Sequence, residues 1–593
     1  MSFNSNLEQK DRSFGYHCSA SAGECENNLS TTHTITKVAD LIRKVALVGL
    51  VNLGIVTALG LAPLSGLIIG AAGFVGASSF YYSSKYFNYK QICQTAGIVF
   101  RNAEQVKKFE VSGVSGQCEA LPTEHSADTE LWREDLIKEA KHNIVLSGNY
   151  CGGKSFAKLL SLLEKQMDNN SNLKVVIISS PRFIKSGNLT KIDELLLKYP
   201  ANFSLIESDD IWHVSTGIKK TTNHTKCLVI DYGKYFILGG SGIKDNFAET
   251  GLDHFPKKEF QDQRKLESNL SLSLPLNKTT DPSDNNVEDG FLGRLVPLSF
   301  RDMDFVFKTQ NGKNLAGKQV YQQMLLLCYR WEQYNKMIRK ENFEEKFTVD
   351  NLGLFTNTAD RLDPNDSVVV GLLKTPVPKW KSIKTTVPSF DQNAKKGENV
   401  AFKVFASGPE HNSSEFAKKL EKRIKSSEKN IVINHMYFHP TSAIMQALIG
   451  AAKRGVKVQI ITTNVYKDGP LSHYAFGPRN KYNYSYLINS LPEEYKSNVE
   501  VYEYQQKNTG NHKKVIIVDD CVIAGSSNLG YKSLVTTSDH ELNFFARSAQ
   551  FADETMKICT IDMCHSEKIK DFNLTFSEYF RAAVHRLMAP LVG

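Results

Sequence analysis

The sequence predicts an α/β protein in which two pseudo-symmetric α/β/α halves form one site, with a hydrophobic helical hairpin at the N-terminus. Three observations support this prediction. A His-x-Lys-x4-Asp pattern occurs twice, at 224–231 and 512–519. The surrounding sequence repeats 287 residues apart, so that 143–150 is echoed by 430–437. A stretch without any charged residue, 45–84, precedes both copies.

The repeat predicts the same order of elements in each half. Helical segments alternate with short apolar runs, and the runs at 173–178 and 456–461 match each other. A continuous apolar run of this length is typical of a strand buried on both faces. Two α/β halves related by pseudo-symmetry follow from this pattern.

Each His-x-Lys pattern leads into such a strand, 227–230 in the first half and 515–518 in the second. Side chains two residues apart on a strand point to the same side. The histidine and the lysine of each copy therefore face one direction together. Each half contributes one imidazole and one ammonium group.

The expected domain organisation combines these features. In chain order we expect a disordered polar tail at 1–44, a transmembrane hairpin at 45–84, a linker at 85–125, the first half at 126–340 with a surface insertion at 257–297, a connecting region at 341–400, and the second half at 401–593.

The uncharged stretch is long enough for two short membrane crossings, since one helical span needs roughly 20 apolar residues. The sequence 63–66 supplies a turn, and lysines and arginines flank both ends. The positive-inside rule then places both flanks, and the catalytic portion, on the cytoplasmic side of the membrane. One tilted span, or a hairpin buried in the soluble part, is the alternative. The composition resembles hydrophobic hairpins of bacterial proteins inserted into host vacuole membranes.

Composition limits the function only weakly. A net charge of +9 over 593 residues allows an anionic lipid surface or a nucleic acid without choosing between them. The ten cysteines show no paired framework, which is typical of a reducing compartment. Cys559, Cys564 and His565 lie close together but lack a matching second pair, so we expect no metal and no cofactor.

The two patterns resemble the paired motifs of the phospholipase D superfamily, whose members join two half-sites into one active site. The stretches 434–440 and 443–461 are similar to those of bacterial cardiolipin synthases and related phosphatidyltransferases. The resemblance covers roughly 126–593. It implies metal-independent transfer of a phosphatidyl group to water or to an alcohol, through a phosphohistidine.

Under that resemblance the four motif residues take distinct roles. His224 is the candidate nucleophile, and His512 protonates the leaving oxygen before it activates water or an alcohol. Lys226 and Lys514 neutralise the charge of the phosphate and of the five-coordinate transition state. Pseudo-symmetry alone leaves the order of the two histidines open, and the family favours the earlier one as nucleophile.

Carboxylates complete the expected site. A nucleophilic histidine needs an acceptor on its second ring nitrogen. In the family an acidic residue beyond each motif supplies it, which implies Asp302 and Glu541 here. Asp231 and Asp519 are expected to anchor their own loops.

A glycine and serine turn follows each motif. Asn528 is the expected phosphate donor of the second turn, but Gly242 stands at the corresponding position of the first turn. Asn246 or a backbone amide is a candidate substitute. The full set of expected supporting residues is Asn528, Ser526, Ser241 and Asn246.

Three functions remain open. The first is a membrane-anchored phospholipase D or cardiolipin synthase-like enzyme with a phospholipid membrane as partner and substrate. The second is a nuclease of the same superfamily, and the third is a membrane scaffold that has lost turnover. Tyr482, Tyr484 and Tyr486, near Arg479 and Lys481, fit either stacked bases or a lipid interface. The sequence indicates neither the lipid head group nor the oligomeric state. Four other histidines receive no chemical role: His213, His254, His435 and His439.

Overall fold

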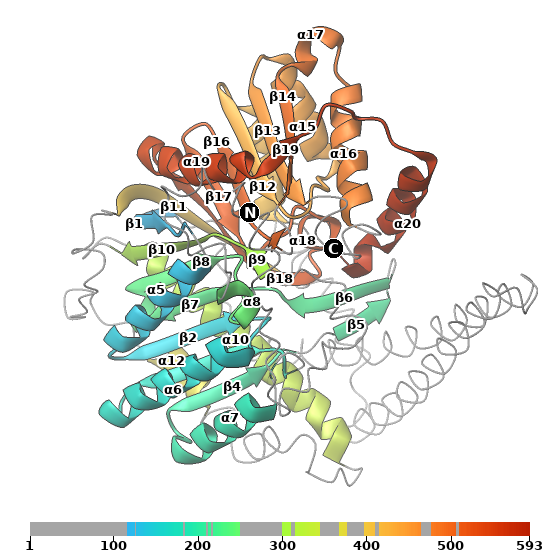
Figure 1. Ribbon diagram of the computed structural model, residues 1–593. Helices are drawn as coiled ribbons and strands as arrows, with labels where there is room; N and C mark the ends of the chain where they lie inside the picture. The colour runs from blue at the N-terminus through green and yellow to red at the C-terminus, as the bar shows by residue number, and fades with distance from the viewer. Residues whose placement is uncertain are drawn as a thin grey trace, which may run out of the picture. The chain divides into compact units, whose positions relative to one another are not determined.

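The structure is a computed structural model (Figure 1) that describes residues 115–124, 126–181, 184, 186–208, 211–214, 218–248, 299–309, 315–343, 367–375, 397–408, 414–463, 476–505 and 509–592. These residues fall into two compact units. The smaller contains β5 (Ile211–Val214), β6 (Ile218–Asn223) up to Thr222, and helix α10 (Leu315–Phe343) from Tyr329 onward. The larger contains all other described elements. The tail, the hairpin and the insertion expected from the sequence lie outside the described residues.

The first half of the larger unit contains seven strands in one sheet. In spatial order they are β4 (Phe203–Glu207), β3 (Lys174–Ser179), β2 (Asn143–Gly148), β7 (Cys227–Ile230), β8 (Tyr235–Gly239), β10 (Asp304–Thr309) and β1 (Ser115–Pro122). β2, β3 and β4 are parallel, and every other neighbouring pair is antiparallel.

The second half repeats this order strand for strand. The counterparts are β14 (Val499–Tyr504), β13 (Lys457–Thr463), β12 (Asn430–His435), β16 (Lys514–Val518), β17 (Cys521–Gly525), β18 (Asp539–Arg547) and β11 (Glu398–Ser407). The pairings have the same directions as in the first half, and the short β19 (Ser566–Lys568) adds to β14. The mixed α/β fold with internal repetition is the one that the sequence predicts.

The two halves meet along one antiparallel seam, where β1 pairs with β11 from Ser115↔Lys403 to Ala120↔Glu398. A second connection is the parallel pair β9 (Ser299–Arg301) and β15 (Thr509–Asn511). Both seam strands begin inside segments that the sequence analysis treated as irregular. β1 lies within the expected linker 85–125, and β11 begins within the expected connection 341–400, so these two boundaries need correction.

Helices cover the strands. Those of the first half are α5 (Ser126–Glu139), α6 (Gly153–Asn169), α7 (Ser186–Lys198), α8 (Asp245–Ala248) and α10, and α12 (Val368–Lys374) contacts β3 and β4. Those of the second half are α14 (Glu415–Lys425), α15 (Ser442–Lys453), α16 (Gly477–Asn489), α17 (Glu493–Lys496), α18 (Tyr531–Leu534), α19 (Ala549–Cys564) and α20 (Phe576–Val592). Side-chain oxygens of Ser414, Thr441 and Ser548 cap α14, α15 and α19, which accounts for where these helices begin.

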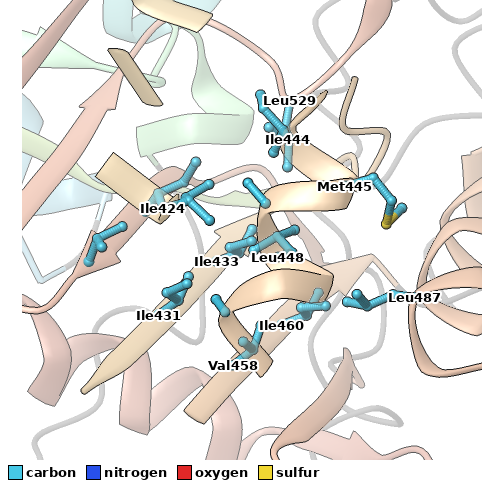
Figure 2. Close-up of a cluster of buried hydrophobic side chains, with 14 of the residues drawn as sticks. Ile424, Ile431, Ile433, Ile444, Met445, Leu448, Val458, Ile460, Leu487 and Leu529 are labelled. Carbon is cyan, nitrogen blue, oxygen red and sulfur yellow. The ribbon is translucent and has the colours of Figure 1, made fainter. Parts of the chain in front are cut away.

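The second-half core shows why strand alternation produces layers (Figure 2). Ile431 and Ile433 of β12 point into a cluster shared with Leu448 of α15 and Leu487 of α16. Val432, between them on the strand, is buried but does not belong to that cluster. Alternate side chains therefore bury against helices on opposite faces, as the continuous apolar runs require.

Aromatic rings fill the interior at the seam. Phe307 of β10 stacks on Phe236 of β8 at 4.8 Å and meets Phe402 of β11 and Phe544 of β18 edge to face at 4.9 and 5.0 Å. Phe551 of α19 extends the cluster through Phe305. Large buried rings contribute strongly to core stability, so this cluster ties the halves at a defined relative position.

In the described part of the chain, no helix combines the length and the apolar character that a membrane span requires.

Candidate active site

A tight turn follows each motif strand, at Asp231 in the first half and at Asp519 in the second. Asp231 and Asp519 adopt positive φ angles of 49° and 54°, which asparagine and aspartate tolerate better than most residues. The Asp231 carboxylate accepts backbone hydrogen bonds from Lys141, His142 and Asn143, the first at 3.1 Å and the second at 2.7 Å. Asp519 accepts the equivalent bonds from the backbone of 428–430. Both carboxylates lie at the ends of their strands opposite the histidines and hold the preceding helix end to the motif strand.

The structure brings together the two histidines and the two expected carboxylates, but crosswise. His224 Nδ1 of the first half lies 3.1 Å from both carboxylate oxygens of Glu541 in the second half. His512 Nδ1 of the second half lies 2.6 Å from Asp302 Oδ2 in the first half. Each half therefore orients the histidine of the other. With Nδ1 occupied, the Nε2 atom of each ring remains for chemistry.

Backbone contacts reinforce this crossing. The His224 amide donates to the carbonyl of His540, and the His512 amide donates to the carbonyl of Arg301, at 3.0 and 2.9 Å. His540 and Arg301 each precede the supporting carboxylate in the sequence. One short segment of each half thus holds both the backbone and the ring of the opposite histidine.

The lysines lie beside their own histidines, as the strand alternation predicts. Lys226 Nζ donates to the carbonyl oxygen of His224, and Lys514 Nζ to that of His512, each at 2.9 Å. Lys514 Nζ is also 3.2 Å from His512 Nε2. Both lysines are almost fully buried.

Burial and like charge govern the titration of the site. Desolvation and the positive charge of Lys514 lower the pKa of Lys226 to about 7. Desolvation together with Lys514, Lys226 and His224 lowers the pKa of His512 well below its usual value. His512 thus lies within electrostatic reach of His224 and of both lysines. An anionic ligand would reverse the shifts, because it favours the protonated forms.

The carboxylates differ in their surroundings. Burial raises the pKa of Asp302 to about 6, although the two motif lysines oppose this. Burial would also raise the pKa of Glu541, but the charge and hydrogen bond of His224, with Lys226 and Ser526, bring it down to about 2. Glu541 accepts hydroxyl hydrogen bonds from Ser526 at 2.5 Å and Ser533 at 2.7 Å, which stabilise its ionised form.

The glycine and serine turns explain why the halves differ. Ser526 has Gly240 as its first-half counterpart, and a Cβ atom there would lie 2.5 Å from Asp302 Oδ1. The shorter Asp302 thus occupies the space that a serine hydroxyl takes beside Glu541. Gly242 stands opposite Asn528 in the repeat, and a Cβ atom there would lie 3.0 Å from the Tyr150 carbonyl oxygen. The first turn has no room for an asparagine side chain.

The residues expected to bind phosphate differ in the hydrogen bonds that they make. The buried side-chain oxygens of Asn528 and Ser241 have no hydrogen-bond partner within the described residues. Ser241 also donates its amide to Asp304 Oδ1 at 3.1 Å, just as Ser527 donates to Asn543 Oδ1. Ser526 supports Glu541 rather than offering a free hydroxyl. The Asn246 side chain lies outside the described residues.

Sequence reasoning missed several residues around His512 and Glu541. The rings of Phe247 and Phe300 lie 5.2 and 5.1 Å from the His512 ring and stack on each other at 4.9 Å. Phe300 adjoins Arg301 in a segment that the sequence analysis placed near the carboxylate, so that position carried a signal. No sequence signal pointed to Phe247 or Ser533, because neither belongs to a motif and only the fold shows their contacts with His512 and Glu541.

A buried charged cluster also escaped detection. Asp562 of α19 accepts hydrogen bonds from Arg301 Nε and Lys513 Nζ, each at 2.5 Å, and from Asn434 Nδ2 at 2.6 Å. Asn511 donates to Asn434 Oδ1 at 2.9 Å. The cluster surrounds the segment that holds His512. The first half has a neutral counterpart, in which Asn223 donates to Ser147 and Ser208.

His435, which received no role in the sequence analysis, lies opposite Lys514 where β12 pairs with β16. His435 is buried, and its Nδ1 accepts a long 3.4 Å bond from the Leu529 amide. Cys559 is buried while Cys564 is exposed, and within the described residues no group of histidine, cysteine and carboxylate side chains could hold a metal.

Comparisons with known proteins find relatives of part of the chain. Residues 420–560 match the family model described as cardiolipin synthase, PLD-like domain. Cardiolipin synthase 2 of Staphylococcus epidermidis is 25% identical over 205 residues, 33% of this chain and 38% of that protein. Cardiolipin synthase B of Salmonella typhi is 31% identical over 145 residues, 24% of this chain and 32% of that protein. The aligned region thus spans well under two thirds of these relatives.

Two solved structures are also similar. Phosphatidylserine synthase from Haemophilus influenzae is 14% identical, with a TM-score of 0.46 over 82% of this chain and 98% of that one. A phospholipase D family member, Nuc from Salmonella typhimurium, is 20% identical, with a TM-score of 0.23 over 29% of this chain and 99% of that one. Family assignment rests on the sequence matches rather than on these scores.

The matches confirm the resemblance expected from the two motifs: the chain is similar to the phospholipase D superfamily and, within it, to cardiolipin synthases.

Proposed function

We propose that this protein transfers a phosphatidyl group from a phospholipid to water or to an alcohol through a phosphohistidine. One observation carries the proposal: two imidazoles, each fixed by a carboxylate of the opposite half, share one buried site with two lysines. Such a site can bind one phosphodiester and act on it from two sides. The family matches support a phospholipid as the substrate.

In the first step, His224 Nε2 attacks phosphorus while Glu541 holds Nδ1 and stabilises the positive ring. The P–O bond to the leaving group breaks, and His512 donates its Nε2 proton to the departing oxygen. Lys226 and Lys514 neutralise the non-bridging oxygens as negative charge develops on them. The products are a free alcohol and a phosphatidyl group bonded to His224.

In the second step, His512 Nε2, now neutral, takes the proton of an incoming water or alcohol. The resulting nucleophile attacks phosphorus and breaks the P–N bond to His224. The proton lost by His512 in the first step is recovered, so the cycle closes without metal or redox chemistry. The lowered pKa of His512 suits its role as base, and the negative charge of a bound phosphodiester raises that pKa for its role as acid.

The test uses the full-length protein with vesicles of phosphatidylcholine or phosphatidylglycerol and a primary alcohol, in parallel with single-stranded DNA. We expect phosphatidyl-alcohol and phosphatidate by mass spectrometry, and loss of both with His224→Ala. The variant His512→Ala should also lose both products, because the first step then lacks its acid and the second step its base. DNA cleavage without lipid turnover would support the nuclease, and no turnover of either substrate would leave the scaffold.

A further inference from the structure

Helix α20 packs through one side, among those of its side chains that the structure describes, and exposes another. Glu578 and Ala582 are buried, whereas Phe576, Tyr579 and Phe580 are 86%, 54% and 61% exposed. Positions i, i+3 and i+4 lie on one side of a helix. The three exposed rings therefore form a continuous aromatic stripe on the side of α20 that faces away from the protein.

Helix α16, which packs against α20, extends this stripe. The rings of Tyr482 and Tyr579 meet edge to face at 5.9 Å, and Tyr486, one turn further along α16, is 45% exposed. We call these five residues, Phe576, Tyr579, Phe580, Tyr482 and Tyr486, the aromatic face. Tyr484 does not belong to it, because it is buried and donates its hydroxyl to Glu503.

The charges beside the aromatic face are positive. Glu578 is the single acidic residue in the sequence of α20, and it is buried and paired with Lys481 at 3.0 Å. Arg586 is exposed, and its guanidinium lies 5.0 Å above the Tyr482 ring. Aromatic side chains with an apolar body and a polar edge, flanked by arginine, are typical of helices that lie in the interfacial layer of a bilayer.

The aromatic face also lies close in structure to the candidate site. Helix α18 packs against α20, and Tyr531 at its start and Val535 just after its end are 37% and 44% exposed. Between these two residues, Ser533 points inward and donates to Glu541, the partner of His224. The short helix α18 would therefore lie between a surface bound at α20 and the pair Glu541 and His224.

We propose that the aromatic face docks onto the surface of an anionic phospholipid bilayer. This inference rests on the proposed function, since it supplies the lipid on which the site acts. A second copy of the chain fits the face less well, because a two-fold contact would bring the arginines of both copies together without an exposed acid in α20 to balance them. Anionic head groups provide that balance.

The first test places a photoreactive benzoylphenylalanine at position 580 of the full-length chain, with position 197 on α7 as a matched control, since Leu197 is 71% exposed. After irradiation on phosphatidylglycerol vesicles, we expect phospholipid bonded at 580 and little at 197. A crosslink from 580 to another part of the same chain, or to a second copy, would overturn the proposal. So would equal lipid labelling at both positions.

The second test separates docking from catalysis. The triple variant Phe576→Ser, Tyr579→Ser, Phe580→Ser should lose at least about tenfold of turnover on vesicles with about 30% anionic lipid. It should stay within about twofold of the unaltered protein on a short-chain phospholipid below its critical micelle concentration. Leu197→Ser should change neither rate. An equal loss on both substrates, or no loss on vesicles, would refute docking. If the unaltered protein turns over neither substrate, the proposed function fails, and the crosslink alone decides docking.

Discussion

At the scale of single residues, burial governs the charge of the site. Two lysines and two histidines are buried with two carboxylates, and the pKa values of all four basic groups are lowered. Desolvation is the largest cause for each of them, and neighbouring cations add to it for three of the four. A bound phosphodiester adds negative charge to this site, and that charge favours the protonated forms of the four basic groups.

Lys226 provides the clearest prediction of this kind. We expect Lys226→Met to reduce turnover by about 10²- to 10³-fold, because a transition-state cation is lost. The same variant should unfold at an equal or higher temperature than the unaltered protein at pH 7. The reason is that the folded lysine has a pKa of about 7 against 10.5 when exposed, so its protonation opposes folding.

The pH dependence of this effect has a definite sign. Between about pH 7 and 10 the unfolded state binds the lysine proton more fully than the folded state, so the Lys226 contribution to stability rises with pH. The stability advantage of Lys226→Met should therefore shrink from pH 7 to pH 9. Thermal unfolding of both proteins at the two pH values measures it, and an advantage that grows with pH would contradict the assignment.

Ser533 should tune Glu541 without touching the substrate. We expect Ser533→Ala to lower turnover about 10- to 100-fold, since loss of a hydrogen bond to a charged group costs about 1.5–3 kcal/mol. In a plot of turnover against pH, the acidic limb should move to higher pH, because the Glu541 carboxylate is then less stabilised. Thr536→Ala is the matched control, since Thr536 bonds Ser538 and the Lys532 carbonyl instead. Equal losses in both variants would indicate a general effect on α18.

At the scale of secondary-structure elements, the two turns share one geometry, in which the motif aspartate binds the backbone. Asp231 and Asp519 belong to the motifs, but their carboxylates bind backbone amides at the start of β2 and β12. They fix the register between each motif strand and its neighbour. The histidine at the other end of the segment is positioned only when that register is correct.

Asp519 therefore predicts a stability effect. We expect Asp519→Ala to lower the free energy of unfolding by about 2–4 kcal/mol, through the lost acceptor and a positive φ that alanine tolerates poorly. Asp519→Asn should cost less, because it keeps one side-chain oxygen and tolerates that φ. Urea unfolding compares them, and turnover per folded molecule should stay within about threefold of the unaltered protein. A collapse of turnover with unchanged stability would assign Asp519 to the chemistry instead.

At the scale of the whole larger unit, each half supplies the carboxylate that orients the histidine of the other half. Arg301 of the first half pairs with Asp562 of the second, and Lys513 shares the same carboxylate. These groups are almost fully buried. They lock the segment before Asp302 against the strand that leads to His512.

Removing the shared carboxylate should uncouple the halves. We expect Asp562→Asn to destabilise the protein by about 3–5 kcal/mol, because two cations remain buried without their partner. Adding Lys513→Met should recover part of that loss, since one cation is then removed. Urea unfolding of the single and double variants measures the recovery. If the double variant is the less stable of the two, the charge argument is wrong.

Local sequence determined much of this protein. Continuous apolar runs identified the strands, the two His-x-Lys patterns identified the basic groups, and their matching frames indicated a duplicated fold. These features depend on neighbours a few residues away, which is why they can be recognised without coordinates. The boundaries at β1 and β11 were missed because both strands are defined by pairing with each other.

Tertiary structure alone decided which carboxylate serves which histidine. Asp302 and His512 are 210 residues apart, and His224 and Glu541 are 317 apart. Such pairs depend on the register of the seam and on the packing beneath it, which no local pattern encodes. The aromatic stripe of α20 belongs to the same category, because amphipathic spacing shows that a helix has an apolar side, and only packing decides whether that side is buried.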